Sequence, residues 1–317
     1  ISGFLQYFLL AGDLARHGGL PRFAPLKLDE DVRGFFKALG PATLGSMGTQ
    51  VALFADTIIA TFLPAGALSA LYYADRLNQL PIGVIGIAIG TVLLPEMSRR
   101  ITANDLDGAM KAQRRAFDFT LLFSIPFVAA FLTVPDEIMR ALFARGAFSK
   151  ADAVAAGSTL AAYAIGLIPF VLIRSAVATF YARKDTATPV RASLTGIAVN
   201  VALKVALMGS LAQIGLALAT AVGVWTNLLL VLFFAVRRGF LVLDRAWLMS
   251  LGKFLLTGII LAMAFWLIAR FSGPSLGSMH FRDEVTLVLL AAGGTIVYAL
   301  AILALFGRSW LVSLVRG

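Results

Sequence analysis

The hydrophobic positions of this chain gather in long runs, and short polar stretches separate them. A run of about 20 apolar residues is what a helix needs to cross the hydrocarbon layer of a membrane. A membrane β-barrel would instead need segments of about 10 residues with alternating polarity, a pattern that this sequence lacks. The pattern therefore predicts an all-α, polytopic transmembrane helical bundle.

About eight full spans follow from these runs. They are predicted at residues 38–63, 68–94, 116–134, 153–179, 189–211, 214–236, 247–269 and 285–306. Residues 1–11 are also apolar, with no initiator Met ahead of them, so we expect them to be the end of a partial span. Two further stretches, 99–115 and 136–148, are predicted to form amphipathic helices at the membrane surface.

The basic residues give an independent test of this topology. When the loops are assigned alternately to the two sides of the membrane, most of the 27 Lys and Arg residues fall on one side. Loops rich in Lys and Arg face the cytoplasm. The C-terminus is therefore predicted to be cytoplasmic, and residues 13–37 to form a cytoplasmic linker.

Composition narrows the function classes. The chain of 317 residues is 59% hydrophobic and only 14% charged, with a mean hydropathy of +0.88, whereas a soluble domain has about 25% charged residues. The net charge of +10 belongs to residues beside the spans, so we expect orientation in the membrane and no nucleic-acid partner.

The sequence contains few residues that would support catalysis or metal binding. There is no Cys and there are only two His, which excludes disulfides, thiolate catalysis and a His-rich metal site. The acidic pairs Asp29/Asp31 and Asp105/Asp107 lie in mixed-charge stretches, where solvated loops are the better interpretation, and there is no Walker A sequence. No enzyme activity, metal or cofactor is predicted.

Ionisable residues inside the spans are the candidates for function, because each costs a few kcal/mol in hydrocarbon. Asp75 and Arg76 lie too deep to reach the surface easily, and Arg76 offers a rigid fork of donors suited to phosphate or carboxylate. An Asp75–Arg76 pair is the alternative, although adjacent helix positions point about 100° apart. Arg174 either lines a cavity or extends to the interface, where Arg183 can meet lipid headgroups.

The residues after this charged pair indicate a moving element. Pro81 removes a backbone hydrogen bond, and Gly83 and Gly86 permit bending or close helix approach. We therefore predict a broken helix with a hinge at these three residues. Plain packing of small residues explains the glycines alone equally well.

A second polar group lies in other spans at matching depth. Asp56 and Lys204 are equally far from the outer ends of their spans, and Asn200 is one helical turn from Lys204. These side chains form one buried cluster if the two helices touch. A structural salt bridge and an ion-coupling site are both open interpretations.

The stretch from Ala74 to Ser98, ADRLNQLPIGVIGIAIGTVLLPEMS, closely resembles the MurJ (MviN) family of lipid II flippases. Shorter matches occur in the same order at 40–45, 142–148 and 180–189. The resemblance implies the multidrug/oligosaccharidyl-lipid/polysaccharide exporter superfamily, whose members have two helical lobes and, in this family, a final helix pair. It implies a truncated span and linker at 1–37, a six-helix C-terminal lobe at 38–246, the pair at 247–317, and a missing N-terminal lobe that is required for transport.

The resemblance also assigns roles to residues. It implies that Asp75 and Arg76 line the transport cavity and that Arg76 meets the pyrophosphate or sugar acid of the lipid, while some relatives have a carboxylate where Gln79 stands. Sodium-binding relatives have an acid and an amide at positions resembling Asp56 and Asn200, and a second acid where this chain has Lys204. Lys204 therefore argues against sodium, and we offer it as an internal cation. The final pair is implied to form a groove for the polyprenyl tail.

The function that the resemblance implies is translocation of lipid II, the undecaprenyl-pyrophosphate-linked peptidoglycan precursor. It would occur in the bacterial cytoplasmic (inner) membrane by alternating access, with no covalent change and with lipid II and membrane lipids as partners. The alternatives are an exporter of another polyprenyl-linked oligosaccharide or of drugs, a polytopic glycosyltransferase, and a non-transporting scaffold.

Overall fold

The computed structural model describes residues 2–16, 32, 54, 57–59, 61–242, 244–275, 277, 279 and 281–316. Over these residues its regular secondary structure is helical throughout. The chain divides into two compact units, Ile1–Ser46 and Met47–Gly317. In the first unit the helix α1 covers Ser2–Arg16, where the partial span is predicted. The predicted linker and most of the 38–63 span lie outside the described residues.

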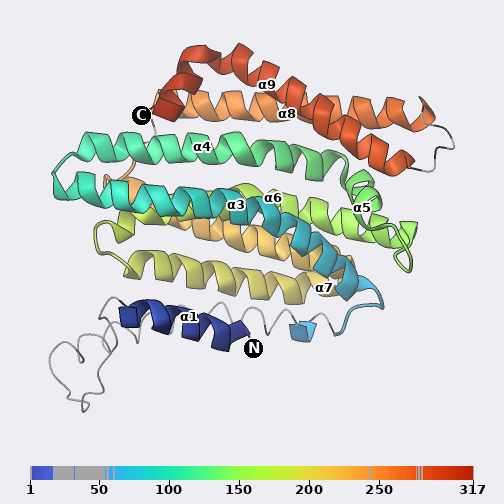
Figure 1. Ribbon diagram of the computed structural model, residues 1–317, viewed down its shortest axis with the longest axis horizontal. Helices are drawn as coiled ribbons and strands as arrows, with labels where there is room; N and C mark the ends of the chain where they lie inside the picture. The colour runs from blue at the N-terminus through green and yellow to red at the C-terminus, as the bar shows by residue number, and fades with distance from the viewer. Residues whose placement is uncertain are drawn as a thin grey trace. The chain divides into compact units, whose positions relative to one another are not determined.

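The second unit is a bundle of long apolar helices (Figure 1). Six of its helices are long and apolar enough to cross a membrane, which confirms the all-α polytopic fold. The long helices are α3 (Ala67–Thr102), α4 (Leu106–Thr133), α6 (Lys150–Tyr181), α7 (Ala187–Arg237), α8 (Arg245–Ser275) and α9 (Arg282–Arg316), and the short helix α5 covers Pro135–Phe143.

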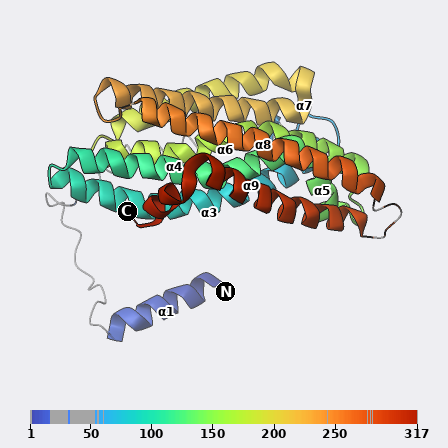
Figure 2. The same cartoon turned by 90° about the horizontal axis from the view of Figure 1, so that it is seen from above.

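The element α7 contains two of the predicted spans. At Ala212 the backbone leaves the helical conformation, with φ 46° and ψ −128°, and the chain turns back on itself (Figure 2). Glycines hold the two halves close, because a Cβ on Gly223 would lie 2.7 Å from the Cβ of Asn200. A Cβ on Gly215 would lie 2.8 Å from the carbonyl oxygen of Leu207. The predicted spans at 189–211 and 214–236 are thus the two arms of one hairpin.

Helix α6 is the centre of this unit, in contact with α3, α4, α5 and α7. One apolar cluster joins α3, α4 and α6 through buried side chains such as Ile85, Leu167 and Val171. Helices α8 and α9 pack against each other and against α4, with Phe254 fully buried. Their apolar surfaces remain more exposed than those of the other spans.

The bounds of α3, α4 and α5 test the two predicted surface helices and the predicted break at Pro81. The amphipathic helix predicted at 136–148 is confirmed in part, because α5 covers Pro135–Phe143 and ends five residues before the predicted bound, while its place at the membrane surface stays a prediction. The surface helix predicted at 99–115 is wrong, because α3 continues to Thr102 and Asp105 caps α4 by accepting a hydrogen bond from the Gly108 amide. The broken helix predicted at Pro81 is also wrong, since α3 is continuous there. A membrane helix tolerates a proline when neighbouring helices surround the freed carbonyl, and Pro81 is buried.

The glycine contacts of the α7 hairpin predict a stability difference between two alanine variants. Gly223→Ala places a methyl group 2.8 Å from the Gly196 carbonyl oxygen and against Asn200, so we expect a loss of about 1–3 kcal/mol from overpacking. Gly209→Ala on the same hairpin meets nothing within 4 Å and serves as the matched control. Melting temperatures in neutral detergent measure the difference. Equal values for the two variants would contradict close packing of the arms.

Candidate functional site

A cavity of about 340 Å³ lies between α3, α6 and α7. Helix α3 contributes residues of the motif that begins at Ala74, α6 contributes its middle, and α7 contributes its second arm. The lining residues are Asp75, Asn78, Gln79, Ile82, Gly83, Tyr163, Gly166, Phe170, Arg174, Thr220, Ala221 and Val224.

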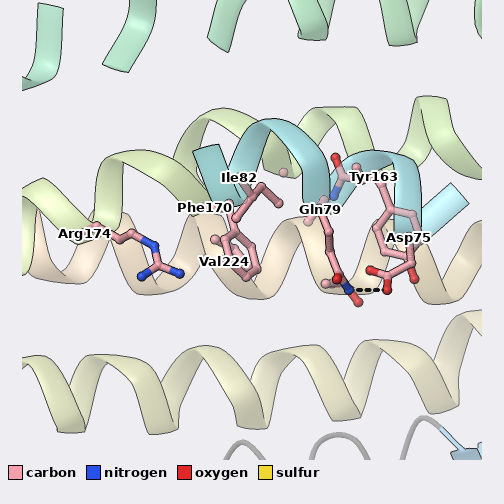
Figure 3. A pocket seen from close by; sticks show the side chains of 12 residues that line it. Asp75, Gln79, Ile82, Tyr163, Phe170, Arg174 and Val224 are labelled. Atoms are coloured by element: carbon pink, nitrogen blue, oxygen red, sulfur yellow. Dashed lines mark hydrogen bonds between the residues drawn. The ribbon is translucent and has the colours of Figure 1, made fainter. Parts of the chain in front are cut away.

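Charged and amide side chains occupy the two ends of this cavity. Figure 3 shows Asp75 and Gln79 at one end and Arg174 at the other, with apolar side chains such as Phe170 between them. The Gln79 amide donates a hydrogen bond to the Asp75 carboxylate, one helical turn away on α3. The cavity therefore offers a cation at one end and a carboxylate–amide pair at the other, and because Arg174 and Gln79 are exposed it is an open cleft between the helices.

Small residues create the room for these side chains. A Cβ on Gly86 would lie 2.7 Å from Nε of Arg174, so the bare backbone of α3 at this point lets the arginine of α6 lie against it. A Cβ on Gly166 would lie 2.8 Å from the Cα of Ala221, which brings α6 and α7 together beside the cavity. Gly83 lines the cavity, and a Cβ there would meet nothing within 4 Å.

Arg76 lies outside this cavity, although it follows Asp75 directly in the sequence. It is exposed on α3, and its guanidinium carbon lies 4.9 Å from the centre of the Tyr72 ring. It is not among the residues that line the cavity. Gln79 is one turn further along α3, so Arg76 and Gln79 are neighbours on the helix surface. Gln79 thus connects the cavity with the exposed face that carries Arg76.

Arg183 belongs to a separate group beyond the end of α6. It donates hydrogen bonds to the carbonyl (2.9 Å) and hydroxyl (2.6 Å) oxygens of Thr179, and its guanidinium lies 4.2 Å from the centre of the Phe240 ring. Burial lowers the pKa of this guanidinium. Nearby, burial opposes ionisation of Asp185, but hydrogen bonds from Thr188 and Arg238 lower its pKa nevertheless. This group connects the α6–α7 turn with the end of α7, away from the cavity.

The predicted cluster of Asp56, Asn200 and Lys204 is described only in part. Asp56 lies outside the described residues. Lys204 is 2% exposed, and Asn200 packs against Gly223 of the facing arm. Among the described residues, the side-chain oxygen of Asn200 is buried without a hydrogen bond.

Sequence reasoning missed several residues of these sites. Asn227 has a buried side-chain oxygen like that of Asn200, and it lies across the α7 hairpin against Gly196. An amide in the middle of an apolar span was the signal that could have identified it. Tyr163 and Thr220 line the cavity, but single hydroxyl groups are common in membrane helices and carry no comparable signal. Within the described part of the chain, no group of three or more acidic or His residues fits a metal.

The side chains that line the cavity are suited to binding a polar ligand. The guanidinium of Arg174 can bind phosphate or carboxylate oxygens through paired hydrogen bonds. The Asp75–Gln79 pair can exchange hydrogen bonds with hydroxyl or amide groups of a sugar or peptide. This combination suits a polar, anionic cargo that has to pass through an apolar bundle.

Comparison with known proteins gives a consistent family. The model of the family described as "Lipid II flippase MurJ" matches residues 1–283. A probable lipid II flippase MurJ of Rhizobium meliloti (strain 1021) is 37% identical over 278 residues, which are 87% of this chain and 52% of that protein. The corresponding protein of Rickettsia prowazekii (strain Madrid E) is 32% identical over 91% of this chain and 55% of its own length. The chain thus spans about half the length of these relatives.

Solved structures show the same fold. The structure described as "Lipid II flippase MurJ, inward closed conformation" superposes with a TM-score of 0.73 at 22% identity, over 90% of this chain and 57% of that one. A transporter of the MOP superfamily from Pyrococcus furiosus superposes with a TM-score of 0.54 at 17% identity, over 86% and 64% of the two chains. At these identities the likeness concerns the fold alone.

Water access to the cavity can be tested with introduced cysteines, because the chain has no native Cys. Arg174→Cys and Gln79→Cys, expressed in membranes in the length that the natural gene encodes, should react with a small water-soluble thiol reagent. Ser175→Cys is the matched control, since Ser175 is the next residue on α6 and is fully buried. We expect its reaction to be at least about tenfold slower. Equal rates at 174 and 175 would contradict a water-accessible cavity.

Proposed function

We propose that this chain, which belongs to the MurJ family of lipid II flippases, forms one part of a transporter that moves lipid II between the leaflets of a bacterial cytoplasmic membrane. The polar headgroup would pass along the cavity of α3, α6 and α7 while the polyprenyl tail stays in lipid. The observation that carries this proposal is the gathering of Arg174, Asp75 and Gln79 around one open cavity between apolar helices. The protein makes no covalent change to its cargo.

The proposed architecture is finer than the helices described above. Residues 38–246 would form a six-helix lobe, in which the two arms of α7 count as two spans, and residues 247–317 a final pair. With the end of a span at 1–11, the chain would cross the membrane with about eight full spans and one partial one. A second lobe would supply the opposite wall of the transport path, because relatives are about twice as long.

The proposed recognition of the headgroup rests on charge. A pyrophosphate is multiply anionic, and Arg174 is the cation of the cavity lining. Arg76 would meet the same headgroup from the exposed face of α3, with Gln79 between the two positions. The Asp75–Gln79 pair would bind sugar or peptide groups of the headgroup. Arg183, near the ends of α6 and α7, would contact lipid headgroups at the interface.

The proposed motion uses the same part of α3. Gly86 leaves space that Arg174 occupies, and Gly83 borders the cavity, so sliding of the continuous helix α3, or its bending near Pro81 during transport, would change the width of the cavity directly. In this way the hinge residues and the headgroup site would act together. Membrane potential, which is worth about 2.3 kcal/mol per charge at 100 mV, or consumption of lipid II outside would drive net flux.

The orientation follows from the basic residues. We propose that the C-terminus and the α3–α4, α6–α7 and α7–α8 turns face the cytoplasm, since most Lys and Arg residues lie at that end. The cargo would then enter from the side where its synthesis is completed and leave at the side of α5.

Complementation of a flippase-depleted bacterial strain tests the roles of the two arginines. Arg174→Ala and Arg76→Ala, in the length that the natural gene encodes, should reduce rescue to the level of an empty vector because the cation for pyrophosphate is lost. Arg174→Lys should rescue partly, since it keeps the charge but loses the fork of donors.

The control for this experiment is Arg191→Ala, which removes an exposed arginine of α7 outside the cavity and should rescue fully. Immunoblotting of membranes establishes that each variant inserts. Normal growth with Arg174→Ala would remove this residue from the mechanism, and normal growth with Arg76→Ala would do the same for Arg76.

The position of Lys204 makes a further prediction about ions. We propose that this buried ammonium takes the place of a bound cation, so the melting temperature of the protein should be the same in sodium and in potassium at equal ionic strength. A sodium-dependent rise that disappears in Asp56→Ala would contradict this role of Lys204.

A further inference from the structure

A second cavity, of about 630 Å³, lies at the end of the bundle where α3 ends, α4 and α8 begin and α9 ends. It shares no lining residue with the first cavity. Its wall is strongly basic and carries Arg100, Lys111, Arg114, Arg115 and Lys253. The proposed transport uses none of these residues.

Two of the five cations are held in a fixed network. Glu96 accepts hydrogen bonds from both Arg100 and Arg115 at 3.0 Å, and Arg100 also reaches Asp105 at 3.0 Å. Gly108 makes room for this network, because a Cβ there would lie 2.3 Å from an Arg100 nitrogen. These arginines are thus positioned before any ligand arrives, and their charges are partly balanced.

The remaining cations give the cavity an excess of positive charge. Arg114 pairs with Asp244 at 3.3 Å across the exposed rim. Lys111 and Lys253 form no ion pair with any residue that the structure describes. The Lys253 ammonium instead lies 5.2 Å from the centre of the Phe306 ring. Both lysines can therefore direct their charge to a ligand.

Aromatic side chains form the opposite wall. At Gly307 the backbone of α9 has φ 81° and ψ 163°, a conformation that only glycine adopts readily, and the helix changes direction there (Figure 1). Beyond this kink the Trp310 ring lies against Phe306 in a tilted arrangement, with 4.3 Å between ring centres. Phe254 of α8 packs against Phe306 at 4.7 Å. The kink thus places an indole in the lining of the basic cavity.

One carboxylate also borders the cavity, at its floor. Asp118 of α4 is 6% exposed and accepts a hydrogen bond of 2.8 Å from the hydroxyl of Ser250 on α8. This bond ties α8 to α4 below the cavity. Because the carboxylate is buried and hydrogen-bonded, the accessible wall above it is dominated by the cations.

We propose that this cavity binds a phosphate group, supplied by the headgroup of an anionic phospholipid. Basic pockets between membrane helices at the cytoplasmic ends bind such headgroups, and arginine and lysine are the residues that recognise phosphate. The indole of Trp310 has the mixed polarity of residues that lie at the membrane interface. The inference rests on the charged lining of this cavity and on the proposed orientation, and it is independent of the proposed transport.

Titration of the purified protein, in the length that its natural gene encodes, tests the proposal. In neutral detergent, phosphatidylglycerol should bind with saturation and raise the melting temperature, while phosphatidylcholine at equal concentration should not. Lys111→Gln/Lys253→Gln should weaken phosphatidylglycerol binding by at least about tenfold, because two cations near the surface are lost. Added salt should weaken binding to the unaltered protein as well.

The matched control is Arg191→Gln/Arg237→Gln, which removes two exposed cations at the same end of the bundle but outside the cavity. It should bind phosphatidylglycerol like the unaltered protein.

A parallel titration with inorganic pyrophosphate identifies the source of the phosphate. If pyrophosphate binds at least as tightly as phosphatidylglycerol, and the Lys111→Gln/Lys253→Gln variant binds it less well, the site belongs to a soluble phosphate compound and the lipid assignment is overturned. Equal binding by the two double variants would overturn the site itself.

Discussion

A polar side chain among apolar helices has to meet another polar group or water, and this constraint shapes the bundle. Helix α6 contacts four other helices, and it carries Arg174, whose exposed side chain lies against α3 at Gly86. The structure accommodates this charge by keeping the facing surface of α3 bare at Gly86 and by leaving a cavity between α3, α6 and α7. The charge and the cavity depend on each other.

Close helix contacts elsewhere make that cavity possible. The glycines of the α7 hairpin and Gly166 of α6 bring backbones together, so the bundle is tight around the cavity and open within it. Packing of small residues is what drives helix association in lipid, where burial of apolar surface gives no advantage. The same residues that stabilise the bundle therefore define where the cavity lies.

Much of this fold could be predicted from the sequence, because span length and turn position depend on local patterns. The turn at Ala212 and the short helix α5 are such cases. The continuity of α3 through Pro81 was not predictable, since it depends on neighbours that surround the proline. In the candidate site, Asp75 and Gln79 line the cavity, whereas Arg76 does not. Adjacent positions on a helix point in different directions, and only the packing of the helices decides which of them faces α6. Ala221 contributes backbone and a methyl group, for which a sequence gives no signal.

The two cavities place positive charge at different depths of one bundle. Several residues of the basic cavity near the ends of α3 and α9 belong to the Lys and Arg residues from which the orientation in the membrane is proposed. Their arrangement around Glu96 and Trp310 is a tertiary feature, formed by helices far apart in the sequence. A positive-inside pattern and a binding site can thus be made of the same residues.

We propose that a phosphorylated lipid headgroup binds where α3, α6 and α7 meet. The most direct measurement is a cryo-electron microscopy structure of the protein, in its natural length and in a lipid bilayer, with lipid II bound. Our account predicts pyrophosphate density within hydrogen-bonding distance of Arg174 or Arg76, with the sugar near Gln79. A headgroup resolved elsewhere, with the cavity of α3, α6 and α7 closed to it, would contradict the account.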